Sequence, residues 1–239
     1  MDRRSKWLNA RRRCSSITST IAFDVPYHVT QRGNHRQDVF FTPADHQVYL
    51  HWLAEYAARY QLCIWAYCLM TNHIHLVVTP SFDLALARTM QAVQSRYTSR
   101  MNKDYHWNGH LWQGRFISCP MDESYFWQAI RYVERNPLRV RITERAEEYP
   151  WSSAAAHCGQ VTDPLLAPLP AENMIAPDGW SGWLDGEDGN ELLILRAGTL
   201  SGRPCGSPDF VDNLSTVMGR SLHAKPRGRP RKNITSLKE

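Results

Sequence analysis

Residues 62–79 read LCIWAYCLMTNHIHLVVT and give the strongest indication of how the chain folds. They contain two short runs rich in β-forming side chains, 62–70 and 73–79, which the polar pair Thr71-Asn72 separates. Two such runs joined by a short polar turn are typical of a β-hairpin. We therefore expect two adjacent antiparallel strands here.

The chain before this hairpin predicts one strand and one helix. Residues 26–33 (PYHVTQRG) are rich in strand-forming side chains and end at the turn signal Gly33-Asn34. Thr42 is a suitable helix cap and Pro43 a suitable first helical residue, and aromatic side chains then recur at helical spacing. A strand followed by a helix is the expected result.

The chain after the hairpin predicts a helix, a strand and a further helix. The first of these helices has an amphipathic stripe that runs to about residue 103. Its apolar members are Leu86, Met90, Val93, Tyr97 and Met101. Residues 113–119 predict a fourth strand, and Asp122 caps a helix that we expect to run to Asn136, where Pro137 ends it.

The predicted order is β-α-β-β-α-β with an added helix. It indicates the α+β class, with a ferredoxin-like antiparallel sheet, helices on one face and a small helical C-terminal extension. We divide the chain into a basic N-terminal segment (1–22), a main domain (23–157), a proline- and glycine-rich linker or irregular wrap (158–200), and a small helical unit with a basic tail (201–239).

Composition restricts the protein classes. The 239 residues carry 28 Lys and Arg against 23 Asp and Glu, a net charge of +5. The basic residues are concentrated near both ends, which suggests a polyanionic partner, although either end taken alone could equally be a solvated surface. The six cysteines include no C-x-x-C pair, so we expect reduced thiols in a cytoplasm. No run resembles a secretion signal or a membrane span, although residues 1–20 leave a transit peptide open.

The hairpin and the last helix of the main domain contain the candidate chemistry. His73 and His75 are two positions apart in a strand, so both imidazoles project from one face and could bind a divalent cation. Tyr132 and Asn136 are four apart on a helix and therefore neighbours. Glu134 lies roughly 200° from Tyr132 around that helix and should point away from it.

Several separated motifs together resemble a known family. They are YHVTQRGNHR (27–36), HIH (73–75), WQGRF (112–116), RYVERNPLR (131–139), SGRPCGSPDF (201–210), GRSL (219–222) and PRGRPRK (226–232). The chain resembles the single-tyrosine HUH transposases over residues 23–232, and its C-terminal motifs are similar to those of the REP-associated tyrosine transposases. It departs from relatives at Leu138–Arg141, where they often carry Val-Arg-Ala-Gly, so the turn after the last helix could differ.

This resemblance implies an enzyme that cuts and rejoins single-stranded, hairpin-forming repeat DNA through a 5′-phosphotyrosine intermediate. Tyr132 matches the family's nucleophile, His73 and His75 its metal ligands, and Asn136 the side chain that completes the metal site. A phenol with an ordinary pKa near 10 is a poor nucleophile and needs a polarised phosphodiester. An amide oxygen beside imidazoles suits Mg²⁺ or Mn²⁺. DNA is the expected partner, no membrane is involved, and monomer and homodimer both stay open.

Basic and aromatic side chains of the main domain are candidates for DNA contact. Arg96, Arg100 and Lys103 form a basic strip on the helix that ends near residue 103, which could follow phosphates or simply face solvent. Trp112 could stack on a base, with Gln113 and Arg115 as hydrogen-bond donors.

Two further groups of cations complete the candidates for DNA contact. Arg32 and Arg36, on either side of the Gly33-Asn34 turn, are candidates by the resemblance. The tail sequence Arg-Gly-Arg-Pro at 227–230 resembles an AT-hook core, whose arginines enter a narrow minor groove. The tail candidates are Arg227, Arg229, Arg231 and Lys232.

Alternative interpretations remain at this level. A protein of the same fold could bind repeat DNA without cutting it, although the intact candidate site argues against this. The run HIHLVV also partly matches the histidine-triad nucleotide hydrolases, but Val77 occupies the position of their third histidine. Tyr97 is a rival nucleophile because Arg96 and Arg100 are near it, but its spacing with the apolar stripe places its ring towards the core.

Overall fold

The protein is described by a computed structural model that covers residues 22–223 apart from 23, 171–174, 187–188 and 190. The basic N-terminal segment, and the tail from residue 224 onward, lie outside the described residues. No helix in the described part is long and apolar enough to cross a membrane.

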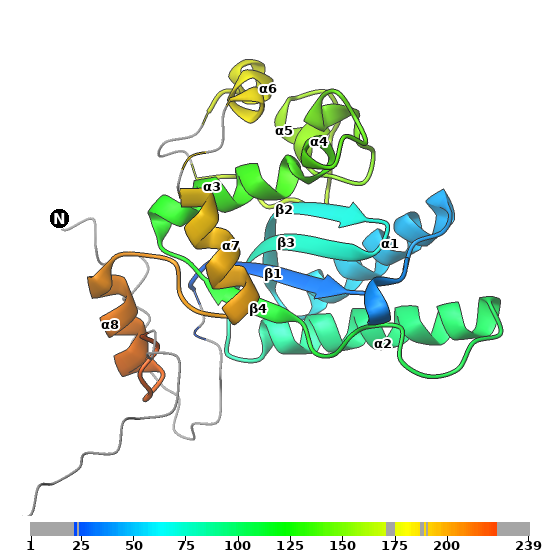
Figure 1. Cartoon of the computed structure of the whole chain (residues 1–239), viewed down its shortest axis with the longest axis horizontal. Helices are drawn as coiled ribbons and strands as arrows, with labels where there is room; N and C mark the ends of the chain where they lie inside the picture. Colours follow the sequence, from blue (N-terminus) through cyan, green and yellow to red (C-terminus); the bar gives the residue numbers. More distant parts are fainter. Residues whose placement is uncertain (1–21, 23, 171–174, 187–188, 190, 224–239) are drawn as a thin grey trace, which may run out of the picture.

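A four-stranded antiparallel sheet forms the centre of the fold (Figure 1). Its strands, in the spatial order β2-β3-β1-β4, are β1 (Tyr27–Arg32), β2 (Leu62–Met70), β3 (His73–Pro80) and β4 (Ile117–Pro120). The predicted hairpin of β2 and β3 is confirmed, with Met70 opposite His73 across the two-residue turn. Because side chains alternate along each strand, the sheet offers two separate faces for packing.

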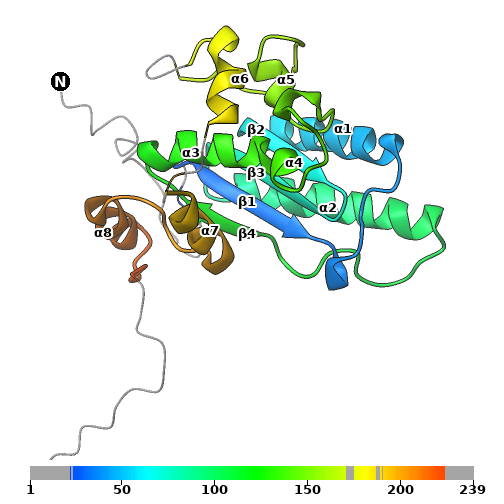
Figure 2. The ribbon, with the colours of Figure 1, turned by 45° about the horizontal axis from the view of Figure 1, so that its top comes forward.

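Two long helices cover one face of the sheet (Figure 2). Helix α1 (Pro43–Arg59) begins at the expected cap, where Thr42 and Asp45 bind each other's backbone N–H groups in a capping box. Helix α2 (Ala85–Asp104) buries the predicted apolar stripe. Together with alternate residues of β1, β2 and β3 they enclose the larger of two hydrophobic cores.

Helices α3 (Glu123–Glu134) and α7 (Glu191–Ser201) cover the opposite face. Helix α7 packs against α3, β4 and β1, as Figure 1 shows. The α+β class and the antiparallel sheet are therefore confirmed, but helices lie on both faces rather than on one. The reason is that β2 and β3 are apolar on both sides, so that Ala66 and Val77 pack on α3 while Ile64 and Leu76 face the other core.

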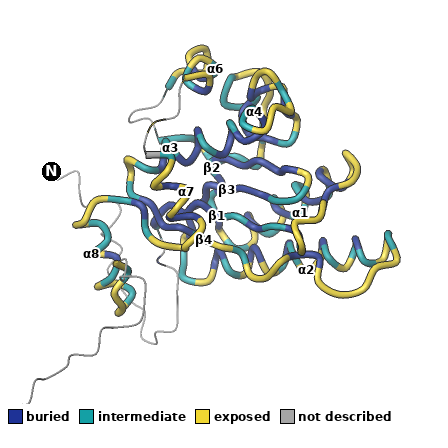
Figure 3. Tube along the Cα trace, in the orientation of Figure 1, coloured by how far each residue is buried: buried dark blue, intermediate teal, exposed yellow. Residues whose placement is uncertain are grey.

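Shorter elements complete the described chain. They are the 3-10 turns η2 (Asn34–Arg36) and η3 (Ala146–Glu148) and the helices α4 (Asn136–Arg139), α5 (Ala154–His157), α6 (Pro177–Asp185) and α8 (Pro208–Val217). Ser207 caps the start of helix α8, and Gly219 follows the helix with a positive φ. The buried strands and the exposed rim formed by these short elements are distinguished in Figure 3.

Three expected boundaries were wrong. The fourth strand begins at Ile117 rather than residue 113, because residues 112–115 form a loop that bonds to the end of β1. The helix with Tyr132 ends at Glu134 rather than at Asn136, and after a break at Arg135 the chain continues as α4 with proline in its first turn. Residues 158–200 are not an irregular linker, since they contain α6 and most of α7.

Buried side chains explain the helices in the expected linker. Trp180 of α6 and Leu195 of α7 are buried in the second core beside α3. Glu134 is fully buried and accepts hydrogen bonds from Trp180 Nε1 at 2.8 Å, His157 Nδ1 at 2.6 Å and the Ser153 hydroxyl. Glu134 therefore points away from Tyr132, as predicted, and ties α3 to α5 and α6.

We expect Glu134→Ala to lower the free energy of unfolding by roughly 3 kcal/mol, because each buried donor left without a partner costs about 1–3 kcal/mol. Urea denaturation monitored by circular dichroism measures this. Glu123→Ala, an exposed change on the same helix, is the matched control and should cost well under half as much. Equal losses in the two variants would contradict a structural role for the buried carboxylate.

Candidate active site

Three imidazoles lie side by side on the sheet face that α3 and α7 cover. The antiparallel register sets Thr30 opposite His75 and Arg32 opposite His73, so these four side chains share one face with His28, two positions before Thr30. The predicted common face of His73 and His75 is confirmed, with ring centroids 4.9 Å apart. The sequence analysis did not select His28, whose ring lies 5.1 Å from that of His75.

These imidazoles are neutral at pH 7. Burial lowers the pKa of His28 to about 3 and that of His73 to about 4, and the pKa of His73 is lowered further by the charge of Arg32. Burial also holds the pKa of His75 well below its ordinary value, with smaller contributions from neighbouring histidines and arginines. A neutral imidazole keeps one nitrogen lone pair, which is the form that binds metal ions.

We expect these buried histidines to make the metal-free fold acid-labile. The unfolded imidazoles take up protons near pH 6.5 whereas His28 stays neutral in the folded chain to about pH 3, so the unfolded state binds more protons between these values. The contribution of these histidines to the free energy of unfolding is therefore fully present above pH 6.5. It falls as the pH falls, by up to about 1.4 kcal/mol per pH unit per histidine.

Urea denaturation at several pH values between 7 and 4, in a chelator, measures this slope. His28→Gln should make it shallower because the amide does not titrate, whereas exposed His51→Gln should leave it unchanged. An unaltered slope in His28→Gln would show that His28 does not contribute.

Tyr132 faces the histidines from α3. Its ring centroid lies 5.5 Å from that of His75 and 5.4 Å from that of His28, both in edge-to-face arrangements. The ring is partly exposed, and within the described part of the chain its hydroxyl makes no hydrogen bond. A phenol oxygen is therefore available beside a pair of neutral imidazoles.

Arg139 brings positive charge to the same place. Its guanidinium carbon lies 4.9 Å from the centroid of the Tyr132 ring, a cation–π distance. The Nη1 atom is buried and has no hydrogen-bond partner among the described residues. Arg139 was not among the residues selected from the sequence, although its position about two helical turns after Tyr132 could have indicated it. An unpartnered guanidinium N–H beside a tyrosine is suited to bind a phosphate oxygen.

Asn136 lies one turn after Tyr132 and is buried. Its Nδ2 donates to the carbonyl oxygens of Tyr132 at 2.9 Å and Val133 at 3.2 Å. Carbonyl oxygens only accept hydrogen bonds, so these contacts fix the amide with Nδ2 towards its own helix. The Oδ1 atom makes no hydrogen bond within the described part, which leaves it free as a hard, neutral ligand.

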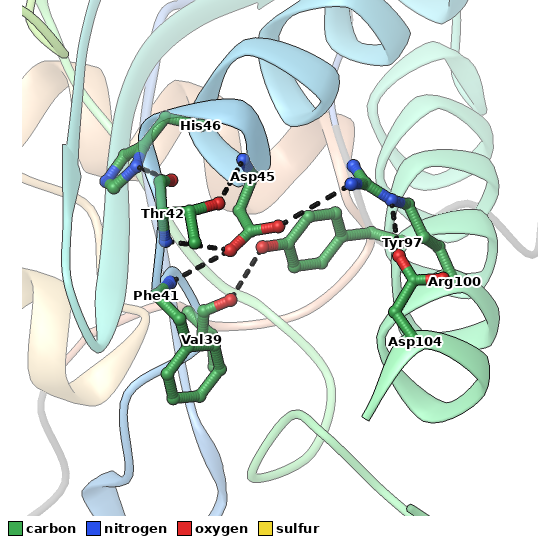
Figure 4. A network of polar contacts seen from close by, with 8 residues as sticks. All are labelled: Val39, Phe41, Thr42, Asp45, His46, Tyr97, Arg100 and Asp104. Atoms are coloured by element: carbon green, nitrogen blue, oxygen red, sulfur yellow. Dashed lines mark hydrogen bonds and ion pairs between the residues drawn. The ribbon is translucent and has the colours of Figure 1, made fainter. Parts of the chain in front are cut away.

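Tyr97 is excluded as a nucleophile by its surroundings (Figure 4). Its side chain is fully buried in the first core, on the other face of the sheet from His75. The hydroxyl donates to the carbonyl oxygen of Val39 at 2.6 Å, and burial raises the pKa of this phenol far above its ordinary value. The expectation that this ring faces the core is confirmed.

The basic strip on α2 is largely neutralised. Arg96 pairs with Glu55 at 2.9 Å, and Arg100 pairs with Asp104 at 2.9 Å and lies 3.7 Å from Asp45. Lys103 is exposed further along the helix. Because α2 covers the face opposite His73 and His75, the structure does not bring this strip to the site.

Trp112 was expected to stack on bases, but its ring is buried. It is 7% exposed and packs edge-to-face against Tyr49 and tilted against Tyr97, so it contributes to the core rather than to an exposed stacking surface. The neighbouring Gln113 and Arg115 are exposed. They line a hollow of ≈ 570 Å³ between the loop and α2.

The loop also connects to the histidine face through β1. Gln113 N donates to the Arg32 carbonyl oxygen at 2.9 Å, and Gln31 Nε2 donates to the Gly114 carbonyl oxygen at 2.7 Å. Arg32 is partly exposed beside His73, and Arg36 is exposed in the turn η2. These cations lie at the His73 end of the sheet. Arg227, Arg229, Arg231 and Lys232 lie outside the described residues.

Comparison with known protein families agrees with the resemblance seen in the sequence. Residues 21–136 match the family described as transposase IS200 like. The segment that carries His73, His75, Tyr132 and Asn136 is therefore similar to the IS200-like transposases. No curated protein matches the chain.

Two solved structures are similar to the chain. A REP-associated tyrosine transposase bound to a REP hairpin matches with a TM-score of 0.52 at 13% identity, covering 66% of this chain and all of that one. A protein assigned as a transposase from Deinococcus radiodurans R1 matches with a TM-score of 0.36 at 20% identity, covering 51% of this chain and 97% of that one. The first likeness shows that the two proteins share a fold.

Proposed function

We propose that this protein is a metal-dependent, single-strand DNA endonuclease and strand transferase of the REP-associated type, acting on hairpin-forming repeat DNA. The observation that carries the proposal is the position of Tyr132, with an unbonded hydroxyl and a ring 5.5 Å from that of His75. A nucleophile beside neutral imidazoles is the arrangement that metal-assisted phosphodiester cleavage requires.

The donor set suits a divalent cation. His73 and His75 are neutral and share one face, and the free Oδ1 of Asn136 adds a hard oxygen ligand, a combination that suits Mg²⁺ or Mn²⁺. No group of three His, Cys, Asp or Glu side chains in the described part could hold a metal. The proposed ligand set is not such a group, because its third ligand is the amide oxygen of Asn136. When bound, the cation would polarise the phosphodiester and stabilise negative charge on oxygen.

The chain's own residues account for the covalent step. The Tyr132 oxygen attacks phosphorus and loses its proton to solvent as the O–P bond forms, while the bond from phosphorus to the 3′ oxygen breaks and that oxygen takes up a proton. The products are a 5′-phosphotyrosine and a strand ending in 3′-OH. Arg139 can bind a phosphate oxygen through its unpartnered Nη1 and orient the group for attack. Attack by another 3′-OH reverses the step and joins strands.

DNA recognition is assigned to three arginines and one glutamine at the His73 end of the sheet. Their partly or fully exposed side chains offer hydrogen-bond donors; they are Arg32, Arg36, Gln113 and Arg115. Among the solved structures that are similar to this chain, one is bound to a REP hairpin, which supports hairpin DNA as the partner.

Incubation with labelled single-stranded hairpins from the DNA flanking its own gene, with Mg²⁺ or Mn²⁺, tests the function. We expect a nicked strand and a covalent protein–DNA species of equal yield in single turnover, both absent in a chelator. Binding without either product would support the alternative of a catalytically silent repeat-binding protein. Hydrolysis of free nucleotides instead would favour the histidine-triad alternative, which the buried Val77 already disfavours because it cannot replace a histidine.

Deleting the chain from Lys225 onward should weaken hairpin binding and flatten its salt dependence. Each of the several cations removed would otherwise displace counterions, and each phosphate contact contributes about −0.7 to the slope for single strands. Titrations at 50–300 mM salt measure both effects, and cleavage of saturating substrate should persist. Loss of cleavage at saturation with unchanged affinity would contradict a simple anchoring role.

A further inference from the structure

A chain of buried hydrogen bonds runs from α7 to the metal-facing histidine. The Thr199 hydroxyl contacts the Leu195 carbonyl oxygen at 2.7 Å and His28 Nδ1 at 2.7 Å. His28 Nε2 in turn contacts His75 Nδ1 at 2.9 Å, with the two ring planes only 15° apart. His28, His75 and Thr199 are each at most 5% exposed, so water does not compete for these contacts.

The Leu195 carbonyl determines which atom donates in each of these hydrogen bonds. A carbonyl oxygen can only accept, so the single hydroxyl hydrogen of Thr199 points to Leu195. The opposite choice would leave two oxygen lone pairs facing each other at 2.7 Å. The Thr199 oxygen must therefore accept a hydrogen bond from His28, which carries its proton on Nδ1.

The tautomer of His28 determines the tautomer of His75. A neutral imidazole has one donor nitrogen and one acceptor nitrogen, so His28 with a proton on Nδ1 presents a bare Nε2. His75 must then donate from Nδ1 to His28 Nε2. That leaves the lone pair on His75 Nε2, which is the nitrogen available to a cation.

His73 is oriented in the same tautomer by a different partner. Asn72 Nδ2 donates to the Arg36 carbonyl oxygen at 3.1 Å, which fixes the amide and leaves its Oδ1 as an acceptor. His73 Nδ1 lies 2.6 Å from this Oδ1 and must donate to it. Both histidines of the strand thus present Nε2, although their outer contacts come from unrelated parts of the chain.

We propose that His28 and Thr199 are positioning residues that hold His75 with Nδ1 protonated and Nε2 free to bind a divalent cation. The proposal rests on the metal site of the proposed function. It extends that site to α7, which lies outside the matched residues 21–136 (Figure 1). Partners of this kind fix the orientation of metal-binding imidazoles, and their loss typically weakens metal binding 10- to 100-fold.

Long-range ¹H–¹⁵N NMR of the metal-free protein, labelled at its histidines, tests the tautomers directly. We expect protonated Nδ1 and unprotonated Nε2 in both His28 and His75. Assignment follows from the loss of signals in single-histidine variants. A protonated Nε2 on His75 in the metal-free protein would overturn the proposal, because that tautomer has no lone pair facing the cation.

Calorimetric titration with Mn²⁺ provides the second test. Thr199→Val keeps the shape of the side chain but removes the acceptor, and we expect about tenfold weaker Mn²⁺ binding, with His28 changing tautomer. Thr199→Ser restores the hydroxyl and should bind Mn²⁺ as the unaltered protein does. His28→Phe keeps a ring but removes both nitrogens and should weaken binding at least as much as Thr199→Val.

His75→Ala separates the possible failures. Loss of Mn²⁺ binding in His75→Ala, with unchanged binding in Thr199→Val and His28→Phe, would overturn the positioning role and leave the proposed metal site intact. Unchanged binding in His75→Ala would contradict the metal site and with it this proposal. Should His28→Phe fail to fold, the comparison of Thr199→Val with Thr199→Ser and the NMR measurement still test the positioning role.

Discussion

Tyr132→Phe should form no covalent adduct with hairpin DNA while binding it with unchanged affinity. The phenylalanine ring keeps the edge-to-face contacts with His75 and His28 and the cation–π contact with Arg139, so the fold and the surface are preserved. Only the attacking oxygen is lost. Denaturing gels with 5′-labelled and 3′-labelled strands measure the adduct, and fluorescence anisotropy measures the binding.

Tyr97→Phe is the matched control. It also removes a single phenol oxygen, but one that donates to the Val39 carbonyl on the far face of the sheet, so its adduct yield should stay near that of the unaltered protein (Figure 4). Its cost should be about 1 kcal/mol of stability from the lost hydrogen bond. An adduct that persists in Tyr132→Phe and disappears in Tyr97→Phe would reverse the assignment.

His75→Ala should reduce cleavage by roughly a thousandfold or more, because metal assistance is worth several kcal/mol of transition-state stabilisation. Hairpin binding should be nearly unchanged, since recognition is assigned to Arg32, Arg36 and the 112–115 loop. Single-turnover rates in Mn²⁺ measure the effect. Asn136→Ala should be milder, because water can replace a neutral amide ligand.

His110→Ala, an exposed histidine in the loop before Trp112, is the control for His75→Ala and should cleave normally. Full cleavage by His75→Ala, or cleavage by the unaltered protein in a chelator, would remove the metal from the account. A parallel loss of hairpin binding in His75→Ala would instead assign this imidazole to recognition.

Local patterns were sufficient to predict the parts of the fold that depend on short-range order. The two β-rich runs in residues 62–79 predicted the hairpin, and the caps at Thr42 and Asp122 predicted where two helices begin. Strand periodicity also placed His73 and His75 on one face. Each of these follows from spacing within a few residues, which tertiary packing did not override.

Features that depend on contacts between distant residues could not be predicted in this way. His28 is 47 residues from His75 and 171 from Thr199, so spacing along the chain does not connect it with either residue. The sequence around Trp112 suggests an exposed group for base stacking, whereas its ring is buried by residues distant in the sequence, such as Tyr49. The second helical layer formed by α7 was hidden because prolines and glycines dominate the sequence before it.

Charge patterns were the least reliable guide to the surface. Arg96 and Arg100 form a basic strip in the sequence, but their acidic partners come from α1 and from the end of α2. Arg139, in contrast, was noted only as a departure from relatives, and it lies against the Tyr132 ring. Which cations are free for a polyanion depends on packing that a single sequence does not reveal.

Mapping the covalent bond between protein and DNA decides whether Tyr132 is the nucleophile. The unaltered protein is incubated with a labelled hairpin and Mn²⁺, the DNA is trimmed with nuclease, and the peptides are sequenced by tandem mass spectrometry. We expect a 5′-phosphonucleotide on Tyr132, found in the peptide that contains Tyr132 and ends at Arg135. A nucleotide attached to any other residue, or a cleaved strand with no attached protein, would contradict it.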